Sequence, residues 1–231
     1  MNDINLKQNL DFQFSGPYAE LSSKYLSYLL NGDRHHASKL IIDAVSNGAN
    51  IKDIYLHVFQ SCQIEIGRLW QKNKITVAQE HFCTATTQLI MSQLYPFFIN
   101  DEPKNRQVLA VCVGGELHEI GMRMVADFFE MDGWDTYYIG ANTPVDTIIE
   151  TIQSKDIDLI AISVTIGYNL PMVIDLINAI RSHDRNHNFK IMVGGRPFNI
   201  SPDLWKKVGA DGYASDAEKA VIIAKNMLNK I

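Results

Sequence analysis

The stretch VCVGGELHEIGMRMVADFF, from Val111 to Phe129, begins like a buried β-strand and ends like an amphipathic helix. Between the two lies a polar turn that contains Glu116, His118 and Gly121. Neutral imidazole is a good ligand for a transition metal, a nearby carboxylate can orient the ring, and glycine lets a bound group approach the backbone. A bare zinc ion takes about three or four protein ligands, so one histidine does not predict a zinc site. From these residues alone, a solvated surface loop is the simpler interpretation.

The sequence around this stretch alternates short apolar segments with helical segments. Such alternation predicts a parallel, doubly wound sheet, which binds ligands at the carboxyl ends of its strands. The expected strands are QVLAVCV at 107–113, DTYYIG at 135–140, DLIAISV at 158–164, KIMVGG at 190–195 and a weaker GADGYA at 209–214.

The preceding half of the chain, from Tyr18 to about Phe98, has helical periodicity throughout. Asp33 and Thr76 stand where helix N-caps are expected, and Asn31-Gly32 and Gly48 are typical helix ends. Four helices joined by short loops predict a four-helix bundle. The polar segment FINDEPKNRQ, which contains Pro103, is the expected linker. The predicted organisation is a flexible N-terminal segment at 1–17, a helical bundle at 18–100 and a sheet domain at 106–231.

The composition limits the function classes. The chain has 231 residues, of which 46% are hydrophobic and 20% charged, and a net charge of −5. This acidity argues against direct binding to nucleic acid. No segment resembles a membrane span or a signal peptide. Three cysteines without a CxxC spacing are typical of reduced core thiols, which indicates a cytoplasmic protein.

The ends of two later strands add to the motif in the opening turn. ISVTIG places Ser163 and Thr165 at the end of one strand, and VGGRPF places Gly194 and Gly195 at the end of the next. Together these residues resemble the cobalamin-binding domain of methionine synthase and its relatives. That family carries Asp-x-His-x-x-Gly, then Ser-x-Leu, then Gly-Gly, on a flavodoxin/Rossmann-like sheet.

The resemblance implies a role for each part of the motif. His118 would be the lower axial ligand of cobalt, and the serine and paired glycines would shape a slot for the displaced nucleotide tail. Two departures are visible: Glu116 replaces the aspartate, and Ser163-Val164-Thr165 replaces Ser-x-Leu. The second is the weaker match. The cofactor-binding residues implied in this half of the chain are Glu116, His118, Glu119, Ile120, Gly121, Ser163, Thr165, Gly194 and Gly195.

The helical half carries a second motif. In GRLWQKNKITVAQEHFCTA, nine residues separate Trp70 from the Glu80-His81 pair. This spacing resembles the light-sensing cobalamin regulators of bacterial carotenoid synthesis, in which a four-helix bundle covers the upper face of adenosylcobalamin. The resemblance implies that Trp70, Val77, Glu80 and His81 line that pocket. Many of those regulators have a histidine directly after the tryptophan, where this chain has Gln71, and they begin with a DNA-binding domain for which no sequence is seen here.

Three functions are compatible with both motifs. The favoured prediction is a photoreceptor, not an enzyme, that binds adenosylcobalamin. It would act in signalling and transcription regulation through a homo-oligomer or a separate effector protein. The first alternative is a corrinoid carrier of a methyltransferase system. The second is a photoreceptor that binds a bilin together with cobalamin.

Overall fold

The computed structural model describes residues 13–99, 104, 106–183 and 189–229. The chain forms two compact units, Met1–Phe97 and Phe98–Ile231. Residues 1–12 of the predicted N-terminal segment, and 100–103 and 105 of the predicted linker, lie outside the described part of the chain.

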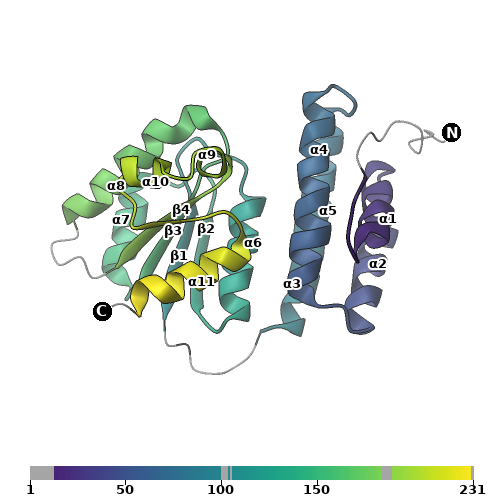
Figure 1. Cartoon of the computed structure of the whole chain (residues 1–231), viewed down its shortest axis with the longest axis horizontal. Coiled ribbons are helices and arrows are strands. Elements are labelled where there is room, and N and C mark those ends of the chain that lie inside the picture. The colour runs from purple at the N-terminus through teal and green to yellow at the C-terminus, as the bar shows by residue number, and fades with distance from the viewer. Residues whose placement is uncertain (1–12, 100–103, 105, 184–188, 230–231) are drawn as a thin grey trace. The chain divides into compact units, whose positions relative to one another are not determined.

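The first unit is helical, as the periodicity predicts (Figure 1). The Asp33 carboxylate accepts a hydrogen bond from the backbone N–H of His36, and Thr76 forms a reciprocal capping box with Gln79, so both predicted caps are confirmed. The helices pack around fully buried side chains such as Tyr25 and Phe59. The elements are α1 (Ala19–Leu30), α2 (Arg34–Ser46), α3 (Ile51–Asp53), the π-helix η2 (Ile54–Gln60), α4 (Ser61–Gln71), α5 (Val77–Leu94) and the 3-10 turn η3 (Tyr95–Phe97).

The third predicted helix differs from expectation in one respect. It runs continuously from α3 to α4, but its middle is the π-helical segment η2 rather than a regular α-helix. A π-helix has i→i+5 hydrogen bonds in place of the regular α-helical ones. Within it, the carbonyl of His57 accepts a hydrogen bond of 3.0 Å from the Ser22 hydroxyl on α1. This tertiary contact has no counterpart in the local sequence pattern.

The second unit contains a five-stranded sheet within its described residues, and every pairing in it is parallel. The strand order is β2-β1-β3-β4-β5, which confirms the doubly wound prediction. The strand β2 pairs with one edge of β1, and β3 pairs with the other edge. The strand order therefore reverses at β1. The strands are β1 (Gln107–Cys112), β2 (Asp135–Gly140), β3 (Leu159–Ser163), β4 (Lys190–Gly194) and β5 (Gly212–Ala214).

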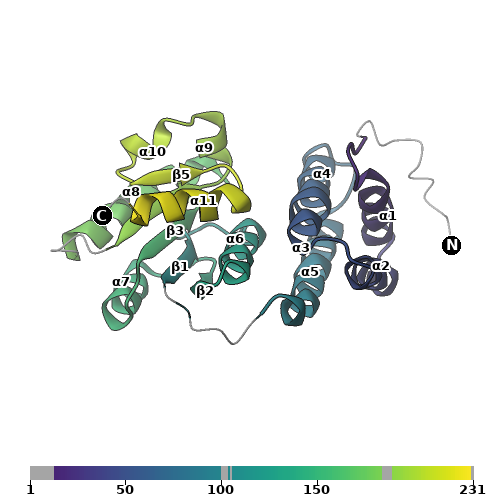
Figure 2. The same ribbon diagram turned by 60° about the horizontal axis from the view of Figure 1, so that its bottom comes forward.

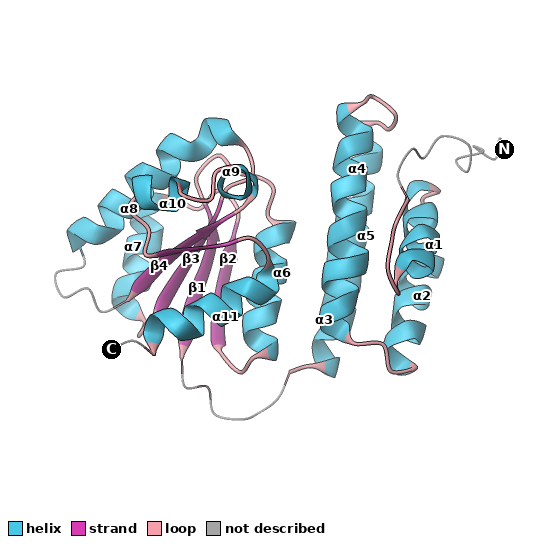
Figure 3. Ribbon diagram, in the orientation of Figure 1, coloured by secondary structure: helices cyan, strands magenta, loops and turns pink. Residues whose placement is uncertain are grey.

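Helices cover both faces of this sheet (Figures 2 and 3). The helix α6 (Ile120–Met131) contacts β1, β2 and α11 (Ala217–Leu228) on one face. On the other face, α7 (Val145–Ser154) and α8 (Leu170–His183) contact each other over a core that includes Leu109, Ile160 and Ile191. The short elements are η4 (Gly167–Asn169), α9 (Arg196–Ile200) and α10 (Leu204–Lys207).

The three cysteines are core residues, as predicted. Cys62, Cys83 and Cys112 are all fully buried, and none forms a disulfide. Burial raises the pKa of the Cys83 and Cys112 thiols to about 12, so both are protonated and unreactive at neutral pH. Among the described residues, no helix has the length and apolar character of a membrane span.

Candidate functional site

The polar turn of the opening motif lies between β1 and α6, beside the point where the strand order reverses. The backbone N–H of Val113 donates to the carbonyl of Ser163, which extends the β1–β3 pairing by one residue. Gly115 then takes a left-handed backbone (φ +75°), and the N–H of Glu116 donates back to the carbonyl of Val113. This tight turn keeps Glu116 at the strand ends, where its side chain is completely buried.

The Glu116 carboxylate joins two loops that are far apart in the sequence. Its Oε2 accepts hydrogen bonds from the backbone N–H groups of Thr165 (2.8 Å) and Ile166 (3.1 Å) and from Nδ2 of Asn169 (3.3 Å). Its Oε1 accepts from the backbone N–H of His118 at 3.0 Å and contacts the ring Nδ1 of the same residue at 2.5 Å. Glu116 therefore holds the β1–α6 loop to the loop that follows β3.

These contacts decide the charge of Glu116. Burial alone raises the pKa of a carboxyl group, but the hydrogen bonds from His118, Thr165 and Ile166 outweigh it and lower the pKa of Glu116 to about 2. Glu116 is therefore an anion at neutral pH. An anion cannot donate a proton, so the short contact requires Nδ1 of His118 to carry the hydrogen.

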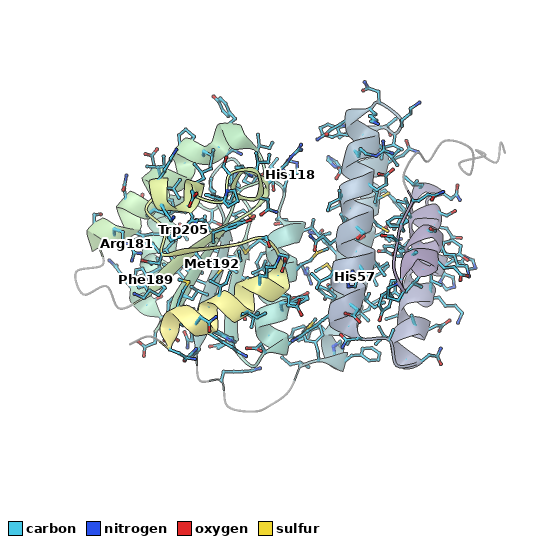
Figure 4. The ribbon with its side chains drawn as sticks, viewed as in Figure 1. His57, His118, Arg181, Phe189, Met192 and Trp205 are labelled. Atoms are coloured by element: carbon cyan, nitrogen blue, oxygen red, sulfur yellow. The ribbon has the colours of Figure 1, made fainter. Side chains whose placement is uncertain are left out.

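His118 is thereby prepared for ligation through its other ring nitrogen. With the hydrogen on Nδ1, the lone pair of a neutral imidazole is on Nε2. The side chain of His118 is 48% exposed and lies beyond the carboxyl ends of the strands (Figure 4). A buried carboxylate behind an exposed imidazole is the arrangement that orients a histidine ligand and raises its basicity.

The other residues of this motif have different surroundings. The Glu119 carboxylate accepts a hydrogen bond from the backbone N–H of Ala141 at 3.2 Å, so it contacts the loop after β2. Ile120 is half-buried at the start of α6. Gly121 is exposed, and a Cβ atom added to it would meet nothing within 4 Å. The chain itself therefore gives no steric reason for glycine here, and its predicted role in admitting a ligand stays a prediction.

The strand-end residues lie next to this turn. Ser163 is buried and pairs in register with Cys112 on β1 and with Gly194 on β4. Thr165, the least secure member of the predicted set, contributes the backbone N–H that binds Glu116. The structure thus brings both residues to the same strand ends as His118.

The paired glycines have a reason within the chain itself. A Cβ on Gly194 would lie 3.2 Å from the carbonyl oxygen of Ala214. At Gly195, with φ +106°, a Cβ would lie 1.9 Å from the carbonyl oxygen of Val164. Close backbone packing therefore requires glycine at position 195, whereas the role of both glycines in a slot for a nucleotide tail stays a prediction.

In the helical unit, two of the predicted residues contact each other. Nδ1 of His81 lies 2.5 Å from Oε2 of Glu80, and the Thr84 hydroxyl lies 3.0 Å from Oε1 of the same carboxylate. Trp70 and Val77 are 42% and 51% exposed, which is high for apolar side chains. Glu80 and His81 thus form a second carboxylate–histidine pair, and the role of all four residues in a cofactor pocket stays a prediction.

Two residues of the site were missed by sequence reasoning. Asn169 binds the Glu116 carboxylate, and Oδ1 of Asn142 accepts a hydrogen bond of 3.0 Å from the backbone N–H of Gly115. Each is a polar residue that follows a predicted strand, and this position was the only signal that the sequence offered for them. The N–H groups of Thr165 and Ile166 carry no side-chain signal at all.

Comparison with known families identifies the cofactor of the chain. The B12 binding domain model matches residues 106–222, which include the whole turn and the ends of β3 and β4. The chain belongs to the B12-binding domain family. A second B12 binding domain model matches residues 21–95, within the helical unit.

Individual relatives support the same assignment. The chain is 32% identical over 117 residues to dimethylamine corrinoid protein 1 of Methanosarcina acetivorans, a match that covers 50% of this chain and 54% of the relative. It is also 32% identical over 117 residues to dimethylamine corrinoid protein 3 of Methanosarcina mazei, of which 68% is covered. The chain thus spans about half to two thirds of the length of these relatives.

The fold has a close counterpart among solved structures. The Methanosarcina barkeri monomethylamine corrinoid protein superimposes with a TM-score of 0.78 at 20% sequence identity, covering 93% of this chain and 100% of that one. At this identity the likeness concerns the fold alone.

The cofactor of this B12-binding protein is cobalamin. The residues of the turn fit this cofactor, because a corrin ring already surrounds cobalt with nitrogen atoms and His118 would have to supply only one more. The comparisons do not support the photoreceptor, signalling and transcription-regulation parts of the prediction. The relatives named above are corrinoid proteins, which agrees better with the carrier alternative.

Proposed function

We propose that this B12-binding protein is a corrinoid carrier, which holds cobalamin through Nε2 of His118 while a methyl group passes between partner enzymes. The 2.5 Å contact between Nδ1 of His118 and the buried Glu116 carboxylate supports this ligation, and the likeness to two corrinoid proteins supports the carrier role. Bound cobalamin supplies a cobalt–carbon bond that can hold and release a methyl group. The relatives' names make methylated amines the first methyl donors to test.

The chain's own residues bind and orient the cofactor in this proposal. Glu116 fixes the hydrogen of His118 on Nδ1, so Nε2 presents its lone pair to a metal. Three donors from the β3–α8 loop hold the carboxylate in place, so the imidazole is oriented before cobalamin binds. A carrier needs no acid or base of its own, because its partner enzymes activate the methyl donor and acceptor.

A light sensor is the second candidate, and the helical unit is the reason to keep it. Exposed Trp70 and the Glu80–His81 pair are the residues that the resemblance to the light-sensing regulators assigns to adenosylcobalamin. The two candidates differ in their upper ligand. A carrier should bind methylcobalamin at least as tightly as adenosylcobalamin, whereas the sensor should prefer the adenosyl form. Binding of a bilin has no support in the comparisons.

Reconstituted methyl transfer tests the proposal. The protein would be loaded with cobalamin, reduced, and incubated with dimethylamine or monomethylamine and a methylamine–corrinoid methyltransferase. Absorbance should then report the methylated cofactor on the wild-type protein, and less of it on His118→Ala. Absence of methylation with every donor, together with a light-dependent change in oligomeric state, would replace the carrier with the sensor.

A further inference from the structure

The β1–α6 loop that carries His118 is also bound on the side away from β3. The backbone N–H of Gly115 donates to Oδ1 of Asn142 at 3.0 Å, and the backbone N–H of Ala141 donates to Oε2 of Glu119 at 3.2 Å. The two hydrogen bonds run in opposite directions between the β1–α6 loop and the loop after β2. Figure 1 shows β1 between β2 and β3, so these two neighbouring loops flank the one that carries His118.

The loop after β2 has an unusual backbone at the residue that makes the first contact. Asn142 is in the left-handed region (φ +53°), where asparagine is tolerated better than most side chains. Gly140, two residues earlier, has φ +74°, and a Cβ there would lie 3.1 Å from Oε2 of Glu119. This conformation turns the Asn142 side chain towards Gly115, and the loop packs closely against Glu119.

Gly115 is the residue through which this contact reaches the site. It directly precedes Glu116, and its left-handed backbone sets the direction in which Glu116 and His118 leave the turn. Thr165 and Ile166 hold Glu116 from the β3 side, and Asn142 holds Gly115 from the β2 side. The turn is thus bound at two consecutive residues from opposite sides, which fixes its rotation as well as its position.

We propose that Asn142 is a positioning residue for the cobalt ligand: its hydrogen bond to Gly115 holds the turn in the orientation that directs Nε2 of His118 at the metal. The inference rests on the proposed function in so far as His118 is the lower ligand. Asn142 does not itself touch the ligand nitrogen. Its effect should therefore be on the fraction of cobalamin that is bound through histidine, more than on folding.

Two substitutions at position 142 separate the hydrogen bond from the backbone conformation. In Asn142→Gly, glycine adopts the positive φ without a steric penalty, but the acceptor oxygen is lost. Asn142→Asp keeps an acceptor at the same distance along the side chain and also tolerates the left-handed region. If only the backbone conformation of residue 142 mattered, the glycine variant would match wild type in both measurements below.

The first measurement needs no cofactor. Amide hydrogen exchange in the protein without cobalamin should be about tenfold faster at Gly115 in Asn142→Gly, as expected for the loss of one hydrogen bond, and near wild type in Asn142→Asp. Equal exchange at Gly115 in wild type and the glycine variant would overturn the proposal, because the side chain would then not hold the turn.

The second measurement observes the ligand directly. Electron paramagnetic resonance of the cobalt(II) cofactor shows a nitrogen splitting when an axial nitrogen is bound, and labelling histidine with heavy nitrogen alters that splitting only if histidine is the ligand. Wild type and Asn142→Asp should show the histidine splitting, and Asn142→Gly should show a several-fold larger fraction without it. Identical spectra for all three would overturn the role of Asn142 but leave His118 as the ligand. Absence of the histidine splitting in wild type would remove both the inference and the proposed lower ligand.

Discussion

The backbone N–H of Thr165 donates to the Glu116 carboxylate over 2.8 Å, although 49 residues separate them in the sequence. This contact connects the ends of β1 and β3, the two strands between which the strand order changes direction. It gives the carboxylate behind His118 a donor that, among substitutions of Thr165, only proline would remove.

Replacing His118 by alanine should shift the cobalt spectrum towards the form without an axial nitrogen and weaken cobalamin binding. The reason is that alanine offers no ligand in place of Nε2. Absorbance and calorimetric titration measure the two effects. His36→Ala is a suitable control, since Nδ1 of His36 has a similar contact of 2.7 Å with the Asp33 carboxylate but lies in the other unit and in no predicted cofactor site. An unchanged spectrum for His118→Ala would contradict the central claim.

Glu116→Gln should destabilise the protein and weaken cobalamin binding. Glutamine keeps the size but has one acceptor oxygen where the carboxylate has two. Its NH2 group would therefore face N–H donors, either those of Thr165 and Ile166 or those of His118. Leaving buried donors without an acceptor costs about 2–3 kcal/mol, measured by urea denaturation of the protein without cofactor. Loss of a carboxylate behind a histidine ligand should lower metal affinity by about 10–100-fold. Wild-type values for both measurements would show that the buried carboxylate is dispensable.

Gly195→Ala should be among the more damaging substitutions in the sheet unit. The new Cβ would lie 1.9 Å from the carbonyl oxygen of Val164, and alanine disfavours φ +106°. Backbone strain and overpacking of this kind together cost about 3 kcal/mol or more. A thermal denaturation curve that matches wild type would show that the connection between β4 and α9 can rearrange.

Gly121→Ala, in contrast, should stabilise the folded protein. Its Cβ would meet nothing within 4 Å, and alanine in a helix is favoured over glycine by about 0.5–1 kcal/mol. If a bound group approaches this backbone as predicted, the same variant should bind cobalamin more weakly while being at least as stable. Unchanged affinity would remove Gly121 from the set of cofactor-binding residues.

Illumination separates the carrier from the sensor. Protein loaded with adenosylcobalamin in darkness should, for a carrier, show the photochemistry of the free cofactor with no change in size-exclusion elution. A sensor should change its assembly or its affinity for a partner protein. If His81 binds cobalt after photolysis, the illuminated spectra of wild type and His81→Ala will differ, because Gln71 is a poor ligand. Identical illuminated spectra would exclude that role for His81.

The sequence by itself determined the architecture and indicated the candidate ligand. Alternating apolar strands and helices specify a doubly wound parallel sheet, because each strand has to be buried on both faces and each crossover needs a helix. The caps at Asp33 and Thr76 were predictable for a similar reason, since they depend only on residues within one turn. His118 and Glu116 could be recognised once Ser163 and the Gly194-Gly195 pair at later strand ends completed a motif that resembles a known family.

Only the tertiary structure decided how the ligand is held. The donors to Glu116 come from Thr165, Ile166 and Asn169, and two of them are backbone N–H groups that every residue except proline has. The contact of Asn142 with Gly115 spans 27 residues and depends on a left-handed backbone at both positions. Sequence patterns report local periodicity and side-chain type. They do not report which backbone groups form hydrogen bonds when β1 lies between β2 and β3. Those hydrogen bonds fix the charge of Glu116 and the orientation of His118.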